Sequence, residues 1–240
     1  IHGAASRFLS KNNALRLLFK SQYGAAKLNY PLFGDAGVDE FDTIVLRPHF
    51  NDGWGWSGAL DDPLFIRDQW FRNSQAAMGH ASSRGNVMHL YINGLYWGLY
   101  NPSERPDVSF AAETFGGDKE EYDAINHNGL HGGNMAAYNQ MIAISEDVEN
   151  GASQAIKNAA YQRIQGKLPD GSDDPTEEIW LDMTNYSDYI LLKHYGGNDD
   201  WPNRNWFSNR RRGPESEGYR FFSWDSEISL ALSSRTDINE

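Results

Sequence analysis

Two short segments late in the chain gather acid and amide side chains that could do chemistry. The first, from Gly196 to Trp206, reads Gly-Gly-Asn-Asp-Asp-Trp-Pro-Asn-Arg-Asn-Trp. The second, from Phe221 to Glu227, reads Phe-Phe-Ser-Trp-Asp-Ser-Glu. A stretch of hairpin length separates them, so we expect Asp225 to fold back beside the first segment. Carboxylate and amide oxygens are hard ligands suited to Mg²⁺, Mn²⁺ or Ca²⁺. A zinc site is disfavoured, because the chain has no cysteine and its histidines are scattered.

The spacing of these residues is typical of phosphoryl transfer. Asp200 and Asn205 are separated as in a kinase catalytic loop, in which the Asp accepts the proton of the substrate hydroxyl and the Asn holds a metal ion. Asp225 follows after a short hairpin, in the place of the Asp that binds Mg²⁺. The alternative interpretation is structural, because Asp and Asn at the end of a helix commonly cap it and turn the chain.

Length and composition narrow the class of protein. The 240 residues carry a formal net charge of −12, 40% of them are hydrophobic, and cysteine is absent. This length suits one large domain or a two-lobed domain with a single cleft. The acidic balance argues against non-specific nucleic-acid binding, which needs a basic footprint. No apolar run approaches the roughly 18 residues of a membrane span. We expect a globular chain that folds around an apolar core without disulfides.

Local patterns predict a β-rich first half, a connector over residues 101–106, and a helical second half with a small late hairpin. The strongest signal is Asn93-Gly94 between two strand-like runs, because a type I′ hairpin turn needs positive φ at both positions. A helix is expected to begin at Asp62-Pro63, with an Asp N-cap and a Pro in the first turn, and to end at Met78. The other predicted strands cover 14–19, 41–46, 206–207 and 219–224, and the other predicted helices cover 136–148, 153–164 and 174–196.

Four motifs in order resemble the CotH (spore coat protein H) kinase family. They are the two acidic segments above, the run Tyr91–Tyr100 with the following Glu104-Arg105, the pair Arg67-Asp68 after Ile66, and the strand Phe41–Arg47 followed by Asn51-Asp52. The likeness extends from about residue 15 to residue 230. It implies a reduced protein-kinase-like fold with two lobes, about 1–100 and 107–240. It further implies that the second lobe is incomplete and that the chain is a fragment of a larger bacterial protein.

The resemblance also implies an activity and the residues that carry it. Members of this family bind ATP with a divalent metal, Mg²⁺ or else Mn²⁺ or Ca²⁺, and phosphorylate Ser or Thr hydroxyls of protein substrates. Asp200 would be the catalytic acid of the loop, and Asp225 and Asn205 would be the metal ligands. Some members are domains of secreted or cell-surface proteins, so we expect an extracellular or surface location and further domains in the same polypeptide.

The nucleotide contacts are expected to depart from those of ordinary protein kinases. No glycine-rich phosphate loop is found in the right context, since Gly53, Gly55 and Gly58 follow a strand and precede an N-cap. Arg47 stands where such kinases have a lysine, and an arginine can still grip phosphate. Together with Arg67 and Glu104, it is our prediction for nucleotide binding. A surface or hinge ion pair is the alternative for these three residues.

Two other functions stay open at this point. The same fold could be a catalytically silent pseudokinase that serves in structure, adhesion or metal binding, and the missing phosphate loop favours it. A carbohydrate-active protein with paired carboxylates ranks third, since neighbouring acids such as Asp199 and Asp200 point apart. The histidines show no ligand spacing, so surface or packing roles are expected for His2, His49, His80, His89, His127, His131 and His194.

Overall fold

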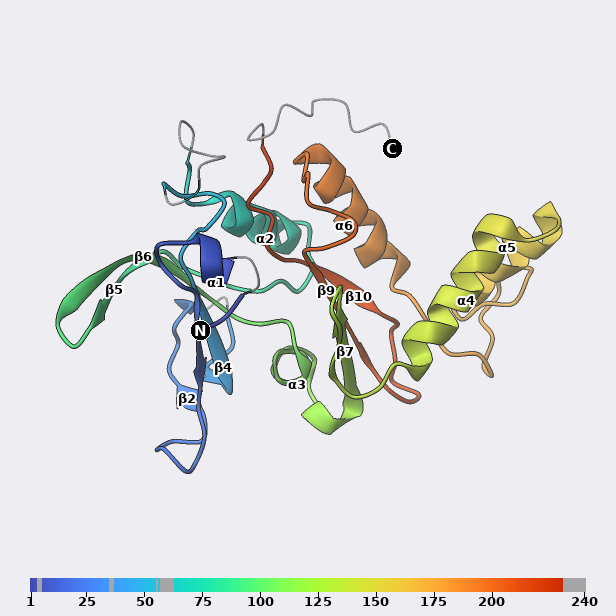
Figure 1. The fold of residues 1–240 in the computed structure, drawn as a ribbon. Coiled ribbons are helices and arrows are strands. Elements are labelled where there is room, and N and C mark those ends of the chain that lie inside the picture. Colours follow the sequence, from blue (N-terminus) through green and yellow to red (C-terminus); the bar gives the residue numbers. More distant parts are fainter. Residues whose placement is uncertain (4–5, 35–36, 55, 57–62, 231–240) are drawn as a thin grey trace.

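The computed structural model describes residues 1–3, 6–34, 37–54, 56 and 63–230. Over this part of the chain there are two four-stranded sheets, one two-stranded sheet and six α-helices, and the paired strands are antiparallel. The predicted α+β class is confirmed. In Figure 1 the first sheet and its long hairpin lie at one end of the molecule. Helices α4 (Ala136–Asn150) and α5 (Gln154–Arg163) extend from the opposite end.

The first sheet has the strand order β1-β4-β6-β5. Its strands are β1 (Leu15–Leu18), β4 (Thr43–Arg47), β5 (Met88–Ile92) and β6 (Leu95–Ser103), and the short elements nearby are α1 (Ser6–Leu9), β2 (Leu28–Asn29) and β3 (Glu40–Phe41). The predicted hairpin turn is confirmed, because Asn93 and Gly94 have φ of 52° and 79°. Strand β6 runs on to Ser103 and pairs Asn101 with Arg47, so residues 101–103 of the predicted connector belong to the sheet.

Helix α2 (Arg67–Ala77) begins later than predicted. The predicted N-cap Asp62 lies outside the described residues, and Ile66 occupies the N-cap position without a side-chain hydrogen bond. A carboxylate from another part of the chain does the capping. Asp52 accepts the backbone N–H of Arg67 at 2.9 Å and that of Leu64 at 2.8 Å. Because the cap comes from the loop after β4, the start of α2 is fixed by tertiary structure.

The second sheet has the order β10-β9-β7-β8. Its strands are β7 (Tyr122–Asn126), β8 (Gly129–Gly132), β9 (Trp206–Arg211) and β10 (Arg220–Ser223), and α3 (Val108–Phe115) and the 3₁₀ helix η2 (Lys119–Glu121) precede it. The predicted late hairpin is β9 and β10. Sequence patterns do not predict α3, β7 or β8. All five residues of β7 are buried, so this strand lacks the alternation of polar and apolar residues that marks a half-exposed strand.

Helix α6 (Met183–Tyr195) also begins later than the predicted 174. Before it, the backbone N–H groups of Trp180 and Leu181 both donate to the carbonyl of Ile164, and Leu181 forms a bridge with Tyr219. Asp182 then caps the helix by accepting the N–H of Asn185 at 2.9 Å. Long-range pairing therefore keeps residues 180–181 extended, although their local sequence permits a helix.

The outer edge of β10 is bonded by two side-chain amides. Gln75 of α2 donates to the carbonyl of Phe221 at 2.7 Å and accepts the N–H of Ser223 at 2.9 Å. Asn185 of α6 accepts the N–H of Phe221 at 2.7 Å. These bonds tie both helices to the strand that leads to Asp225.

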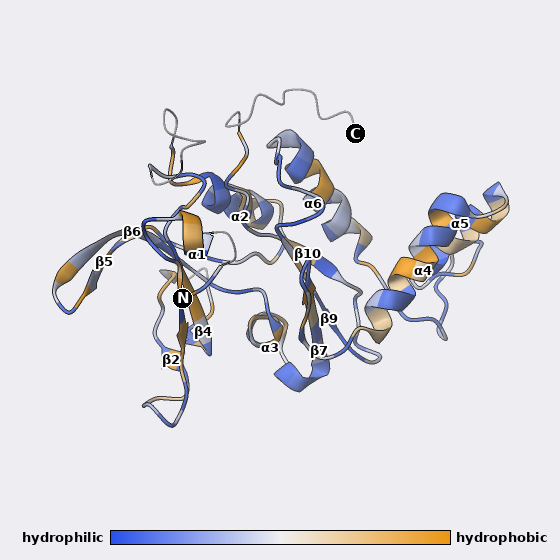
Figure 2. Ribbon diagram, viewed as in Figure 1, coloured by the Kyte–Doolittle hydropathy of each residue, from blue (hydrophilic) through white to orange (hydrophobic). Residues whose placement is uncertain are grey.

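Buried apolar residues gather mainly in the second half. The apolar core, as we call it, consists of Ile125, Met141, Ile144, Ala160, Ile164, Leu181, Tyr189, Tyr219 and Phe221. Helix α2 is different, since Figure 2 shows it as largely hydrophilic, and its buried residues are Arg67, Asp68, Gln69, Phe71, Arg72 and Gln75. Among the described residues, no helix combines the length and apolar character needed to cross a membrane.

Candidate functional site

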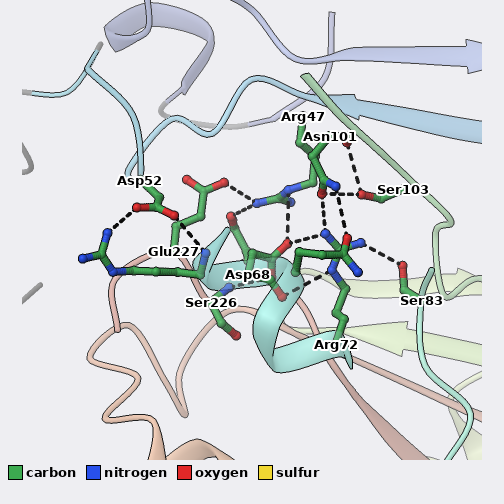
Figure 3. Close-up of polar contacts among 12 residues, drawn as sticks. Arg47, Asp52, Asp68, Arg72, Ser83, Asn101, Ser103, Ser226 and Glu227 are labelled. Carbon is green, nitrogen blue, oxygen red and sulfur yellow. Dashed lines mark hydrogen bonds and ion pairs between the residues drawn. The ribbon is translucent and has the colours of Figure 1, made fainter. Parts of the chain in front are cut away.

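Arg47, at the end of β4, gathers three carboxylates. Its Nη2 donates to Asp225 and, at 2.8 Å, to Glu227, and its Nε lies 3.4 Å from Asp68. The guanidinium also lies 5.0 Å from the ring centre of Trp224. Burial disfavours the charge of Arg47, but the carboxylates outweigh it and raise the pKa well above the ordinary value. Arg47 is therefore a permanent cation between the first sheet and the segment after β10 (Figure 3).

Asp68, in the first turn of α2, joins these parts. Its carboxylate lies 3.2 Å from Arg72 and accepts the backbone N–H of Ser226 at 2.9 Å. Burial raises the pKa of Asp68, but Arg72, Arg47 and the Ser226 amide outweigh it, so the pKa is lowered overall. Asp68 stays ionised and links α2, β4 and the segment that carries Asp225. We call Arg47, Asp68, Arg72, Asp225 and Glu227 the charge cluster.

Asp225 is the exposed member of the charge cluster. Its side chain is 39% exposed, whereas that of Glu227 is 4% exposed. Asp225 has φ of 58°, a left-handed conformation that is costly for a residue with a side chain. Burial raises the pKa of Glu227 to about 7, against the opposing effect of Arg47. The geometry thus separates a buried carboxyl from a carboxylate that solvent and ligands can reach.

The predicted catalytic loop lies beside this segment. Asn205 donates its side-chain amide to Asp200 at 2.9 Å. The Asp199 N–H donates to the carbonyl of Ile228 at 3.0 Å, and the Asn198 amide donates to Ser226 Oγ at 3.3 Å. These bonds hold residues 198–200 against residues 226–228, as the sequence predicts for the two acidic segments.

His127 is a neighbour that sequence reasoning missed. Located in the turn between β7 and β8, it accepts the backbone N–H of Asn205 at Nδ1, 3.2 Å away. Burial lowers the pKa of His127, while the carboxylates of Asp225 and Asp200 act in the opposite direction. Both acids thus lie within electrostatic reach of one imidazole. Only the pairing of β7 with β9 brings His127 here, and no sequence signal reveals it.

The two other predicted nucleotide contacts have partners of their own. Arg67 pairs with Asp52, and both side chains are buried. Glu104 accepts the backbone N–H of Arg84 at 2.6 Å, and burial raises its pKa to about 7. These partners match the ion-pair alternative for Arg67 and a structural role for Glu104. Their part in nucleotide binding stays a prediction.

The oxygen atoms at the site suit a cation that is also coordinated by phosphate oxygens and water. In the described part of the chain, no group of three or more His, Asp and Glu side chains is arranged to hold a metal ion. A Mg²⁺ ion needs fewer protein side chains, because it is commonly held by one or two carboxylates together with phosphate oxygens and water. Asp225 provides an accessible carboxylate. Asn205 uses its amide nitrogen on Asp200, so its amide oxygen is the atom that suits a cation.

A basic groove of about 1020 Å³ lies against β8. Its walls come from β1, β4, α3, β8 and the segment after β6, and its cations are Arg16, Lys20, Lys27, Arg105 and Lys119. His131 of β8 lines it and contacts Arg105 at 2.8 Å. Burial and the charges of Arg105, Arg16 and His127 lower the pKa of His131 to about 4. The histidines of the β7–β8 hairpin therefore connect the groove with the loop of Asp200 and Asn205.

Comparison with known proteins identifies the family. The sequence pattern of the family described as CotH kinase protein matches residues 1–239. Among curated proteins, none matches this chain. The match spans both acidic segments, the hairpin and the strand that carries Arg47. The chain therefore belongs to the CotH kinase family.

Proposed function

We propose that this chain transfers the γ-phosphoryl group of ATP to Ser or Thr hydroxyls of a protein, with a divalent metal ion. We also propose that its two large sheets belong to the two lobes of a reduced kinase fold. One observation carries the proposal: Arg47 bridges from the first sheet to Asp225, and the segment after Asp225 lies against the loop of Asp200 and Asn205. Phosphoryl transfer needs a cation, metal-binding oxygens and a general base gathered in this way.

The nucleotide occupies the basic groove in this proposal. In a chain of net charge −12, a groove lined by five cationic residues and only two acids, Asp42 and Asp107, is a local exception that favours an anionic ligand. Lys27, Lys119 and Arg105 are already paired with acids, whereas Arg16 and Lys20 are exposed on and just beyond β1. We assign the triphosphate to the Arg16 side of the groove, pointing toward Asp225.

The reaction assigns one task to each residue of the loops. The substrate hydroxyl oxygen attacks the γ-phosphorus, its proton passes to Asp200, and ADP leaves with the electrons of the broken P–O bond. Asn205 holds Asp200 in place through its amide. A divalent ion held by Asp225 and the Asn205 oxygen would supply charge neutralisation to the phosphate oxygens. Arg47 orients the Asp225 carboxylate through their ion pair.

A pseudokinase is the second candidate, and one observation favours it. Arg47 pairs with both Asp225 and Glu227, so the charge cluster is an ion-pair network that can serve a purely structural role. In that case the chain would retain the fold and have a structural, adhesive or metal-binding role.

Isothermal titration of ATP, with and without Mg²⁺ or Mn²⁺, separates the two candidates. We expect ATP binding that needs the metal and falls roughly 100-fold or more in Asp225→Ala, because the variant lacks the exposed carboxylate. Asp170→Ala, an exposed acid in a loop, is the matched control and should bind as the wild type does. A folded wild type that binds no ATP with either metal would rule out the kinase proposal.

A further inference from the structure

Ser226, the residue after Asp225, has a bonding partner for each of its polar groups. Its N–H donates to Asp68 at 2.9 Å, and its carbonyl accepts the Ser229 hydroxyl at 2.7 Å. Its hydroxyl oxygen accepts from Lys193 Nζ at 2.7 Å and from the Asn198 amide at 3.3 Å. Ser226 is fully buried, so these bonds are shielded from water. They fix the backbone next to the strained Asp225, and Figure 3 shows the bond from Ser226 to Asp68.

Lys193 is an unusual residue for the inner face of α6. Only 1% of it is exposed, and its Nζ lies 5.1 Å from the ring centre of Phe71 and 5.3 Å from that of Tyr189. Its hydrogen bond goes to the neutral hydroxyl of Ser226. Burial of an ammonium group between two rings is costly, and an apolar side chain of similar size would pack there at a lower cost. The charges of Asp68 and Asp225 offset only part of this cost, so packing alone gives no reason for a lysine at this position.

The conformation of Asp225 supplies a reason. Left-handed φ at a residue other than glycine persists only where the surroundings enforce it, and here the enforcing bonds converge on the next residue. One of them comes from α2 through Asp68, and the others come from α6 and the loop after it through Lys193 and Asn198. Lys193 is the basic residue among these partners. Burial lowers its pKa to about 7, and the charges of Asp68 and Asp225 oppose this effect.

We infer that Lys193 is a positioning residue, which acts through Ser226 to hold the Asp225 carboxylate in its exposed position beside Arg47. The inference rests on the proposed function for its catalytic meaning, while its structural part stands on the contacts alone. Lys193 touches neither the nucleotide nor the metal in this arrangement. Its loss should loosen residues 225–228 and weaken metal-dependent ATP binding without unfolding the chain.

The test compares Lys193→Met and Ser226→Ala with Ser208→Ala. Ser208 is an equally buried serine, and its hydroxyl donates to the Arg220 carbonyl within the β9–β10 hairpin. Hydrogen exchange of residues 225–228, the urea midpoint and metal-dependent ATP affinity are measured for each. We expect Lys193→Met to have an unchanged or higher midpoint, about tenfold faster exchange and about tenfold weaker ATP binding. Ser226→Ala should show the same changes in exchange and ATP affinity as Lys193→Met. The double variant should differ little from either single variant, and Ser208→Ala should show neither change.

Each outcome decides one question. Unchanged exchange at residues 225–228 in Lys193→Met overturns the inference. If Lys193→Met does not fold, Ser226→Ala decides, since it removes the same bond with a smaller change. If the wild type binds no ATP but both variants speed local exchange, the proposed function fails and Lys193 still positions Asp225. If exchange rises and ATP affinity is unchanged, the positioning role is overturned although nucleotide binding stands.

Discussion

Two buried regions of this molecule are made from opposite kinds of side chain. The apolar core lies among α4, α5, α6 and the second sheet, and its members are aliphatic and aromatic. The charge cluster lies between β4, α2 and the segment after β10, and its members are two arginines and three acids. Burial of apolar surface stabilises a fold, whereas burial of ion pairs is close to neutral or costly.

The difference shows which region is kept for its geometry. An apolar core tolerates exchange among residues of similar volume, because its attraction has no direction. The charge cluster depends on direction, because each guanidinium N–H must meet a particular oxygen. A region that adds little stability yet fixes Asp225 is where chemistry is expected. Substitutions of Arg47 and Ile144 test this contrast, and one of Glu104 tests the cost of burying an acid outside both regions.

Arg47→Met should have the largest effect on stability. It leaves Asp225, Glu227 and Asp68 without their shared cation, and loss of one partner from a buried ion pair costs about 3–5 kcal/mol. Urea unfolding measures the loss. Arg163→Met is the matched control, since Arg163 forms an ion pair at the surface with Glu177, and it should cost about 1 kcal/mol or less. Equal losses of stability in Arg47→Met and Arg163→Met would mean that the acids of the charge cluster do not depend on Arg47.

Glu104→Gln should change stability by an intermediate amount, and it should stabilise the protein where Arg47→Met destabilises it. Burial raises the pKa of Glu104 from 4.5 to about 7, so the unfolded chain loses this proton at lower pH than the folded one. The wild type therefore loses stability through this group as pH rises from about 4.5 to about 7. Glu104→Gln should therefore become more stable than the wild type across this range. The difference in the free energy of unfolding should reach on the order of 3 kcal/mol at pH 8.

Urea unfolding at a series of pH values checks the Glu104→Gln prediction. Glu146→Gln, on an exposed part of α4, is the control, and its curve should run parallel to that of the wild type. A constant difference between Glu104→Gln and the wild type from pH 4 to pH 8 would show that the carboxyl of Glu104 is not penalised by burial.

Ile144→Val should have the smallest effect. Ile144 is 2% exposed in the apolar core, and removal of one methylene group there costs about 0.5–1.5 kcal/mol. Thermal or urea unfolding measures this change, and ATP titration should show the wild-type affinity. Ile142→Val, on the exposed side of the same helix, should stay within about 0.5 kcal/mol of the wild type. A weakened ATP affinity in Ile144→Val would show that the two regions are coupled.

Local signals in the sequence account for much of the fold. The Asn93-Gly94 turn, the helices near 136–150 and 154–163 and the late hairpin are all in place, because turn chemistry and helical periodicity act over a few residues. The starts of α2 and α6 are wrong for a physical reason. Asp52 and Ile164 fix them from other parts of the chain, and local patterns carry no record of these partners.

The candidate site divides in the same way. The sequence predicts that Asp200, Asn205 and Asp225 lie close together, and they do, whereas the bond from Asn205 to Asp200 is not predicted. Asp68 as the link, His127 beside Asn205 and Lys193 behind Ser226 all depend on strand pairing or helix packing between distant segments. A single sequence does not reveal such contacts, since no periodicity or motif relates the residues involved.

The side-chain amides along β10 bear on how the molecule behaves in a crowded solution. An outermost strand normally offers a row of backbone groups onto which a strand of another molecule can add, and this is a common route to aggregation. On β10 the N–H and carbonyl of Phe221 and the N–H of Ser223 are already bonded by Gln75 and Asn185. The strand that leads into the candidate site is thus insulated from intermolecular pairing, and two neutral amides do this without adding charge.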